Sequence, residues 1–354
     1  MKCCTACFQD AFIRASIENH GVVGDCDFCG SKDTFIYDIS DSSNPISESI
    51  VGLVQTYLIS DDAKAKPLKD ALRNDWDVFA LEAEAMLSLV KKLCAAYYPE
   101  NAEIFSKKVI IEQLFDNDFL RDFGVVSGYS WSEFAESIKY SNRFHSGMFN
   151  PEQFASFLSI LQSLCPKNAR MYRARIASGK AGFTVGEMGV PPKNQRTAGR
   201  INPDGVGVLY LASDKLTALN EVHAIAFDYI TIGEFQAKDN IKTVNLSGFD
   251  NTSPFSYGGE IEKFAANRKV FQEIAAEIAK PLRRSDNPLE YLPTQYIAEF
   301  IKSQNYDGVE YASTLKKGGH NLAVFQEELF ECVSVETIEV SEILYQTTPE
   351  FLDS

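Results

Sequence analysis

Apolar residues recur at three- and four-residue steps between about residues 46 and 165, which is the period of an amphipathic helix. The stretch "DVFALEAEAMLSLVKKLCAAYY" predicts one such helix over 77–98. The stretch "NPEQFASFLSILQSLCP" predicts a second helix that ends at Pro166. This part of the chain is therefore expected to be a helical module. The apolar stripe of the first helix consists of Val78, Leu81, Ala85, Leu89, Leu93 and Ala96.

After residue 166 the pattern changes to short apolar runs separated by glycine-rich turns. Strands mixed with helices at irregular spacing favour an α+β fold over a regular βαβ array. We expect a cysteine-rich head over 1–35, a helical domain over 36–165 and a mixed α/β domain over 166–354. The expected strands are "RMYRARIA", "VGVLYLAS", "IKTVNL", "DGVEYAS" and "NLAVFQ", and the expected helices are "DKLTALNEVHAIA", "EIEKFAANRKVFQEIAAEIAK" and "PTQYIAEFIKSQ".

One of these strands carries a tyrosine among apolar residues. The run from Val206 to Ala212 lacks polar alternation, so we expect it to be buried on both faces. A phenol in such a strand needs a hydrogen-bond partner or a cavity in front of it. Tyr210 has a structural role if its hydroxyl only bonds a neighbour. It is a candidate site residue if other polar residues gather around it.

Length and charge narrow the classes of function. A chain of 354 residues suggests two or three domains. The net charge of −15 would repel phosphate polyanions, so nucleic acid is not an expected partner. The sequence has no apolar run of about eighteen residues, and "MKCCTACFQD" is not an apolar signal segment. We therefore expect neither a membrane span nor secretion, and a cytoplasmic location.

Five of the eight cysteines fall within the first 29 residues. Cys4 and Cys7 form one CxxC pair, and Cys26 and Cys29 form another, which is the spacing of a structural zinc site. Four thiolates leave no open position on the ion, so the role of the zinc would be to support folding. Cys3 could take the place of Cys4. The alternative is a reduced, metal-free or redox-active pair of CxxC motifs.

The same head contains "RASIENH", which sets Arg14 and His20 apart by five residues. This spacing resembles the Arg-x4-6-His motif of the HEPN ribonucleases, a helical superfamily. Both residues lie within the predicted zinc module, so a structural role is expected for them.

Each of four polar residues of the second half is ordinary when considered alone: Arg173, Tyr210, Glu221 and Ser313. Arg173 alternates with Arg175 along one strand face, as exposed arginines often do. Glu221 lies beside a buried helical stripe, although most helical glutamates are solvated. Ser313 ends a strand, where a hydroxyl usually serves a turn or a cap.

Their order along the chain is more specific. The succession "YRAR", "MGVPP", "AGRINPDGVGVLYLAS", "LNEV", "YLPTQYIAEFIKSQNYDGVEYAS" and "GGHNLAVF" resembles the RES-domain family, named for an arginine, a glutamate and a serine. The resemblance covers about residues 168–330. The preceding cysteine-rich and helical region resembles the HEPN-related module that accompanies some RES domains.

The resemblance implies an ADP-ribosyltransferase-like fold and an enzyme that cleaves the bond between nicotinamide and ribose in NAD. RES proteins are commonly toxins restrained by an antitoxin with an Xre-type DNA-binding domain. The family's arginine, glutamate and serine fall on Arg173, Glu221 and Ser313, with Arg175 as the other candidate for the arginine. The same resemblance places Tyr210 in the aromatic pocket position. It gives a predicted NAD-binding set of Arg200, Arg175, Asn202 and Asn321.

The chemistry suits these residue types. Nicotinamide leaves NAD as a neutral base, so its departure needs no strong general acid. Glu221 could stabilise the developing oxocarbenium ion and accept a hydrogen bond from the ribose. A guanidinium, of Arg173 or Arg200, could bind the pyrophosphate through paired donors. Tyr210 could stack on nicotinamide, and Ser313 could orient the ribose or the carboxamide.

The acceptor of the ADP-ribosyl group remains open. The resemblance favours phosphate, which makes the protein an NAD phosphorylase; water would make it an NAD glycohydrolase. Transfer to a protein is an alternative that keeps the fold. A further alternative places the activity in the helical region, as an RNA-cleaving or interaction module. In the main prediction the chain is a toxin or defence effector with NAD as substrate and a structural zinc.

Overall fold

A computed structural model describes residues 1–40, 45–258, 260–281 and 287–343. The final residues of the predicted 166–354 domain, 344–354, lie outside the described part. The chain divides into two compact units. The first unit comprises Met1–Phe134, Phe144–Leu161 and Gly248–Glu273, and the second comprises Ala135–Arg143, Gln162–Ser247 and Ile274–Ser354. The predicted domain boundaries at 35 and 165 stay a prediction.

The first unit begins with a small antiparallel sheet in the order β1-β3-β2 and one helix, α1. The side chain of Asp10 accepts a hydrogen bond from the Ile13 amide and starts α1. Gly21 ends the helix at a φ of 73°, which glycine adopts without strain. These elements are β1 (Lys2–Cys4), α1 (Ala11–His20), β2 (Val23–Gly24) and β3 (Thr34–Asp38).

The rest of the first unit is mainly helical, as the periodicity predicts, with a three-stranded sheet that the sequence patterns did not indicate. Helices α6 (Trp131–Tyr140) and α9 (Ile261–Ala279) contribute residues to both units. The other helices are α2 (Pro45–Gln55), α3 (Leu68–Asp75), α4 (Ala83–Leu93), α5 (Asn117–Phe123) and α7 (Pro151–Ile160). The sheet has the order β4-β6-β5 and consists of β4 (Tyr57–Ile59), β5 (Lys66–Pro67) and β6 (Lys108–Ile111).

The helix predicted over 77–98 is too long at both ends. Val78 is buried, but it lies in an extended segment before the helix. Its carbonyl accepts hydrogen bonds from the amides of Gln9 and Asp10 in the head instead of from a helical neighbour. Leu81 also precedes α4, and Ala96 is exposed beyond the end of the helix. Within α4 the predicted stripe is confirmed at Leu89 and Leu93 only, because Ala85 is half-buried. Met86 and Val90 are buried too, although the predicted stripe did not include them.

The second predicted helix also ends early. Helix α7 ends at Ile160, and the following residues form the edge strand β7 (Gln162–Cys165) of the second unit's sheet. The Phe157 carbonyl accepts a hydrogen bond from the Leu161 amide, which closes the last turn of α7 before the strand starts.

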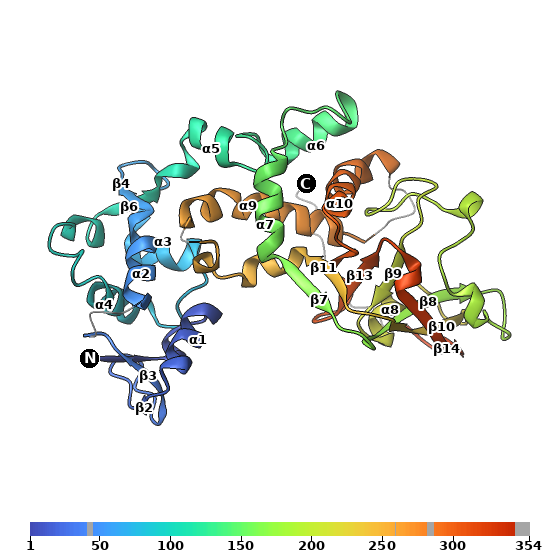
Figure 1. The fold of residues 1–354 in the computed structure, drawn as a ribbon, viewed down its shortest axis with the longest axis horizontal. Coiled ribbons are helices and arrows are strands. Elements are labelled where there is room, and N and C mark those ends of the chain that lie inside the picture. Colours follow the sequence, from blue (N-terminus) through green and yellow to red (C-terminus); the bar gives the residue numbers. More distant parts are fainter. Residues whose placement is uncertain (41–44, 259, 282–286, 344–354) are drawn as a thin grey trace, which may run out of the picture. The chain divides into compact units, whose positions relative to one another are not determined.

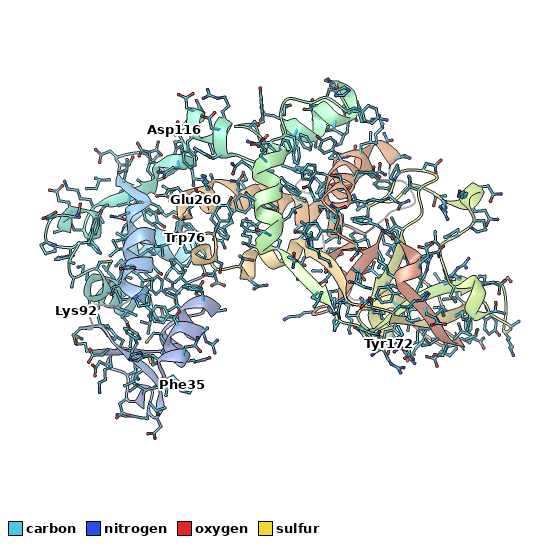
Figure 2. All side chains as sticks on the ribbon, in the orientation of Figure 1. Phe35, Trp76, Lys92, Asp116, Tyr172 and Glu260 are labelled. Atoms are coloured by element: carbon cyan, nitrogen blue, oxygen red, sulfur yellow. The ribbon has the colours of Figure 1, made fainter. Side chains whose placement is uncertain are left out.

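Stacked phenylalanines form the core of the first unit. The ring of Phe249 stacks on that of Phe271 with 4.6 Å between centroids, and Phe154 stacks on Phe271 at 5.4 Å. Trp76, labelled in Figure 2, stacks on Phe264 at 6.4 Å. Aromatic side chains remove a large apolar area from water, so this cluster supplies much of the unit's stabilisation.

The second unit is built on an eight-stranded sheet in the order β14-β10-β8-β9-β13-β12-β11-β7, whose labelled strands can be followed in Figure 1. Neighbouring strands are antiparallel except β11 and β12, which are parallel. Besides β7, the strands are β8 (Arg170–Ala177), β9 (Leu209–Ala212), β10 (Tyr229–Ala237), β11 (Ile241–Asn245), β12 (Gly308–Ala312), β13 (His320–Val324) and β14 (Phe330–Glu339).

All five strands predicted from the sequence are present, and the second unit is a mixed α/β structure as expected. Strands β7, β10 and β14 were not predicted. The specific expectation of an ADP-ribosyltransferase-like fold stays a prediction.

The sheet buries apolar residues on both faces. Helix α8 (Lys215–Glu221) covers one face, where Ala218 packs against Ala174 and Ile232. On the opposite face Met171, Leu211 and Phe235 belong to a second cluster. The third predicted helix is α10 (Leu292–Ser303). Among the described residues every helix is too short or too polar to cross a bilayer.

Candidate active site

A cavity of about 320 Å³ lies in the second unit where strands β8 and β9 part. The two strands pair at Tyr172 and Ala212, and no other described residues join them. Their separation opens the sheet beside α8. The predicted site residues that line this cavity are Arg173, Arg200, Asn202, Tyr210, Glu221 and Asn321.

Glu221 is the focus of the hydrogen bonds in this cavity. The Ser313 hydroxyl and the Asn321 side-chain amide each donate to the same carboxylate oxygen, Oε1, at 2.8 Å. Glu221 ends α8, Ser313 follows β12, and Asn321 lies on β13. Three elements therefore meet at one carboxylate, and Oε2 takes part in neither bond.

An ion pair fixes the helix that carries Glu221. Asp214 caps α8 by accepting from the Thr217 amide at 3.0 Å. Lys316, beyond β12, donates to Asp214 at 2.7 Å. The Lys316 ammonium and the Thr217 hydroxyl hold the pKa of Asp214 well below its usual range. These bonds tie the start of α8 to the segment that follows Ser313.

Tyr210 bonds a neighbour and also faces the cavity. Its hydroxyl donates to Asn202 Oδ1 at 2.7 Å, while the residue lines the cavity. Burial raises the pKa of Tyr210 well above its ordinary value, so the phenol stays a protonated donor. The Asn202 amide nitrogen donates to the carbonyls of Thr197, Pro203 and Val206 at 2.9 to 3.2 Å. Asn202 thus holds a turn together and fixes the tyrosine.

Arg200 is buried, and its donors point toward the end of α9. Its Nε donates to the Lys280 carbonyl at 2.8 Å, and NH1 lies 3.7 Å from Glu277. The guanidinium also packs over the ring of Tyr291. Because these groups already engage Arg200, Arg173 is the better placed of the two candidates for a phosphate contact.

Arg173 lies at the opening between β8 and β9. Strand alternation directs it to the side of Met171 and Arg175 rather than that of Tyr172. Burial and the neighbouring Arg175 charge lower the pKa of Arg173 to about 10. Among the described residues its buried NH1 atom has no hydrogen-bond partner. Arg175 instead packs over the Phe183 ring and donates to the Glu187 carbonyl.

Two residues of this site were missed in the sequence. Tyr311 lines the cavity, and burial, together with the charges of Tyr210 and Glu221, raises its pKa well above the ordinary value. Its place on β12, two residues before Ser313, was a usable signal. Gln295 is buried at the start of α10, three residues before Ala298 on the buried side of the helix. A glutamine in an apolar stripe was the signal there.

The four predicted metal ligands meet in the head. The Sγ atoms of Cys4, Cys7, Cys26 and Cys29 all lie within 4.8 Å of one another. The distances are 3.9 Å for Cys4–Cys7, 3.4 Å for Cys4–Cys29 and 3.5 Å for Cys7–Cys26. Four sulfurs around a tetrahedral zinc ion would lie about 3.8 Å apart, given bonds of about 2.3 Å. The separations are too long for disulfides, and the cluster could hold a metal ion.

Cys3 does not belong to this cluster. Its Sγ lies 3.9 Å from the Tyr37 carbonyl, because β1 directs Cys3 and Cys4 to opposite sides. Arg14 and His20 both lie on the exposed surface of α1. Six helical steps turn the two side chains about 120° apart. The His20 ring packs against Tyr37 at 4.9 Å.

A cavity of about 320 Å³ that holds a carboxylate fixed by two side chains has the size and polar groups of a small-molecule binding site. The RES domain family matches residues 170–346, half of the sequence, and the chain belongs to this family. No curated protein is significantly similar in sequence.

One solved structure is similar to the chain: the crystal structure of the M. tuberculosis MbcT-MbcA toxin-antitoxin complex. The identity is 11%, the match covers 52% of this chain and 92% of the other, and the TM-score is 0.30. A TM-score this low does not define a shared fold.

Proposed function

We propose that the chain cleaves the nicotinamide–ribose bond of NAD. The observation that carries the proposal is the convergence of Ser313 and Asn321 on Glu221 in the cavity. Glutamate and serine are two of the three residues for which the family is named, and they are 92 positions apart in this chain. Membership of the RES domain family supports the same assignment.

The proposed reaction breaks the bond between C1′ of the ribose and the nicotinamide nitrogen. The electron pair of that bond moves to nitrogen and neutralises the pyridinium charge, which leaves an oxocarbenium-like ribose. Glu221 would stabilise this cation, with Oε2 available to the ribose because both donors bind Oε1. Ser313 and Asn321 would keep the carboxylate in place during the reaction.

The remaining cavity residues would bind the ends of the substrate. Arg173 carries a positive charge in a partly buried position next to Arg175, so a phosphate anion would offset both the burial and the repulsion. Tyr210, held by Asn202, would present its ring to nicotinamide.

We propose phosphate as the acceptor on the basis of the family resemblance. A phosphate oxygen would form the new bond to C1′ and give ADP-ribose-1″-phosphate. Water would form the same bond with release of a proton and give ADP-ribose. Transfer to a protein would leave ADP-ribose on the acceptor chain.

Incubation of the purified protein with NAD labelled in the adenosine half tests the proposal. Nicotinamide and a labelled product should form, and the product should be ADP-ribose-1″-phosphate in phosphate buffer. Formation of ADP-ribose both in phosphate buffer and in a phosphate-free buffer would assign hydrolysis. Label retained on protein would assign transfer. Unchanged NAD, in a preparation whose folding is verified by circular dichroism, would contradict the proposal.

We also propose that the four-cysteine cluster holds zinc. The sulfur separations fit a tetrahedral ion, and thiolates are preferred zinc ligands. Because all four ligands come from the protein, the ion would join β1 to the turn at Cys26 and Cys29.

The family resemblance further supports a protein partner, an Xre-type antitoxin that restrains the enzyme in a toxin–antitoxin or defence system. Coexpression with a candidate of this type should yield a complex that can be isolated by size-exclusion chromatography. The isolated complex should cleave NAD slowly. Full activity in an isolated complex would contradict inhibition by that partner.

A further inference from the structure

Gln295 connects the rigid helix α10 to the wall of the cavity. The side chain is 6% exposed, and its amide nitrogen donates to the carbonyls of Gly199 and Asn202 at 2.8 and 2.9 Å. Helix α10 is anchored by the buried residues Ile297 and Ile301. One glutamine therefore fixes two points of a segment that lines the cavity.

That segment is a turn over residues 197–206, which is also held by short-range bonds and by the bond from Arg200 to the Lys280 carbonyl. The Gly199 amide donates to the Asn202 carbonyl at 2.9 Å, and the Val206 amide donates to the Pro203 carbonyl at 3.2 Å. Without Gln295 the Gly199 carbonyl would lose the donor that links it to α10, so the turn would be less firmly fixed to the scaffold.

The 197–206 turn also fixes Tyr210. Asn202 accepts the Tyr210 hydroxyl at 2.7 Å. Gly199 packs so closely that a Cβ atom there would lie 2.9 Å from Asn202 Oδ1 and 3.0 Å from the Tyr210 hydroxyl. A small displacement of the turn would therefore move the tyrosine ring or break its hydrogen bond.

We propose that Gln295 is a positioning residue, which holds the 197–206 turn against α10 and thereby sets the Tyr210 ring for the substrate. Its role in turnover rests on the proposed NAD cleavage. Gln295 does not line the cavity itself, and it acts through Gly199 and Asn202. The turn has a second anchor in the bond from Arg200 to the Lys280 carbonyl, so it should stay folded when Gln295 is changed.

Two isosteric substitutions test the role of the amide donor. Gln295→Met keeps the volume without a donor, and Gln295→Glu keeps a polar group that, when ionised, accepts but does not donate. Both should lower kcat/KM for NAD roughly ten- to a hundredfold, because a misplacement of about 1 Å can cost that much. The loss should fall mainly on kcat, since Arg173 still binds the substrate. Gln304→Met, at the exposed far end of α10, is the matched control.

Hydrogen exchange provides a second readout that does not depend on NAD. The amides of Gly199 and Val206 should exchange faster in Gln295→Met than in the unmutated protein, while amides of β12 keep their rates. If the unmutated protein leaves NAD intact, the proposed function fails and exchange alone decides the role of Gln295. Unchanged exchange overturns the inference, and so does a kcat/KM within twofold of the unmutated value in an active protein.

If neither Gln295 variant folds, Gly199→Ala tests the same connection from the turn. The added methyl group would press on Asn202 and Tyr210, which are its nearest neighbours. A loss in kcat larger than the change in KM supports positioning through the turn. Unaltered kinetics would overturn it.

Discussion

Glu221 differs from an ordinary helical glutamate because two side chains from other segments of the chain donate to it. An exposed carboxylate at a helix end would be bound by water. In this chain Ser313 and Asn321 occupy one of its oxygens at 2.8 Å each. Two fixed donors restrict rotation of the carboxylate, so its charge is already oriented before a substrate enters.

Replacing Glu221 by glutamine should slow NAD cleavage with little change in NAD affinity. The substitution keeps the shape of the side chain and removes the charge that matters most in the transition state. A loss of about 3 to 4 kcal/mol, or roughly two to three decades in kcat, is expected. Steady-state kinetics and NAD titration by calorimetry measure the two effects. A variant that folds and turns over at the unmutated rate would show that Glu221 is not the catalytic carboxylate.

Arg173→Met should raise the stability of the substrate-free protein while weakening NAD binding. The folded state lowers the pKa of Arg173 to about 10, so the charged form is disfavoured there and its removal should stabilise by about 1 to 3 kcal/mol at neutral pH. The gain should shrink as the pH rises through about 10, because the folded protein then releases that proton more readily than the unfolded chain.

Thermal denaturation with and without NAD measures both effects of Arg173→Met. Arg170→Met on the same strand is the control, because Arg170 is exposed and pairs with Glu234. An Arg173→Met protein that is less stable than the unmutated one would mean that the guanidinium has favourable contacts in the substrate-free state.

Residue roles were predictable to different degrees. Glu221, Ser313 and Asn321 could be named from family order, and they lie together in the structure. The contact of Arg200 with the Lys280 carbonyl joins residues 80 positions apart, and sequence spacing carries no information about such a contact. The bonds of Asn202 lie within five residues, but they depend on the conformation of the turn, which spacing alone does not give.

At the scale of elements, periodicity predicted interiors better than ends. Helix α4 buries Leu89 and Leu93 as predicted, but the backbone at Val78 bonds the head instead of continuing the helix. Strand β10 was missed although "YITIGEFQA" is rich in β-branched residues. Strand β14 alternates polar and apolar residues at the sheet edge, a weaker signal than a buried run.

The cysteine head is the element whose spacing was most informative. Cys26→Ser together with Cys29→Ser should remove the proposed zinc ion and destabilise the head by several kcal/mol, since metal binding contributes directly to folding. Elemental analysis and thermal denaturation measure the two effects. Cys3→Ser is the control, because Cys3 lies outside the cluster. An unmutated protein purified without chelators that contains no zinc would contradict the assignment.

At the scale of the whole molecule, the two units are not simple segments of the sequence. The first unit includes Gly248–Glu273, which follows five strands of the second unit's sheet, β7 to β11, in the chain. Aromatic packing explains this, because Phe249 and Phe271 complete the phenylalanine core around Phe154. Linear boundaries drawn from composition could not reveal a core shared by distant segments.

Two candidate sites lie on different units, and each predicts a different effect in a cell that expresses the chain. The site around Glu221 lies in the second unit, whereas Arg14 and His20 belong to the first. Arg14 and His20 point about 120° apart on α1, and His20 packs against Tyr37. Such an arrangement does not bring a cation and an imidazole to one phosphate. If expression stops growth, the cause should be loss of NAD.

Cellular NAD should therefore fall before growth stops, while RNA stays intact. Arg14→Ala and His20→Ala should leave the growth arrest unchanged, because both residues are exposed and remote in sequence from the cavity. Glu221→Gln, expressed at the same level, should restore growth and NAD together. Growth curves, NAD measured in extracts and RNA integrity on gels provide the comparison. Arrest with a full NAD pool, relieved by His20→Ala but not by Glu221→Gln, would move the activity from the second unit to the first.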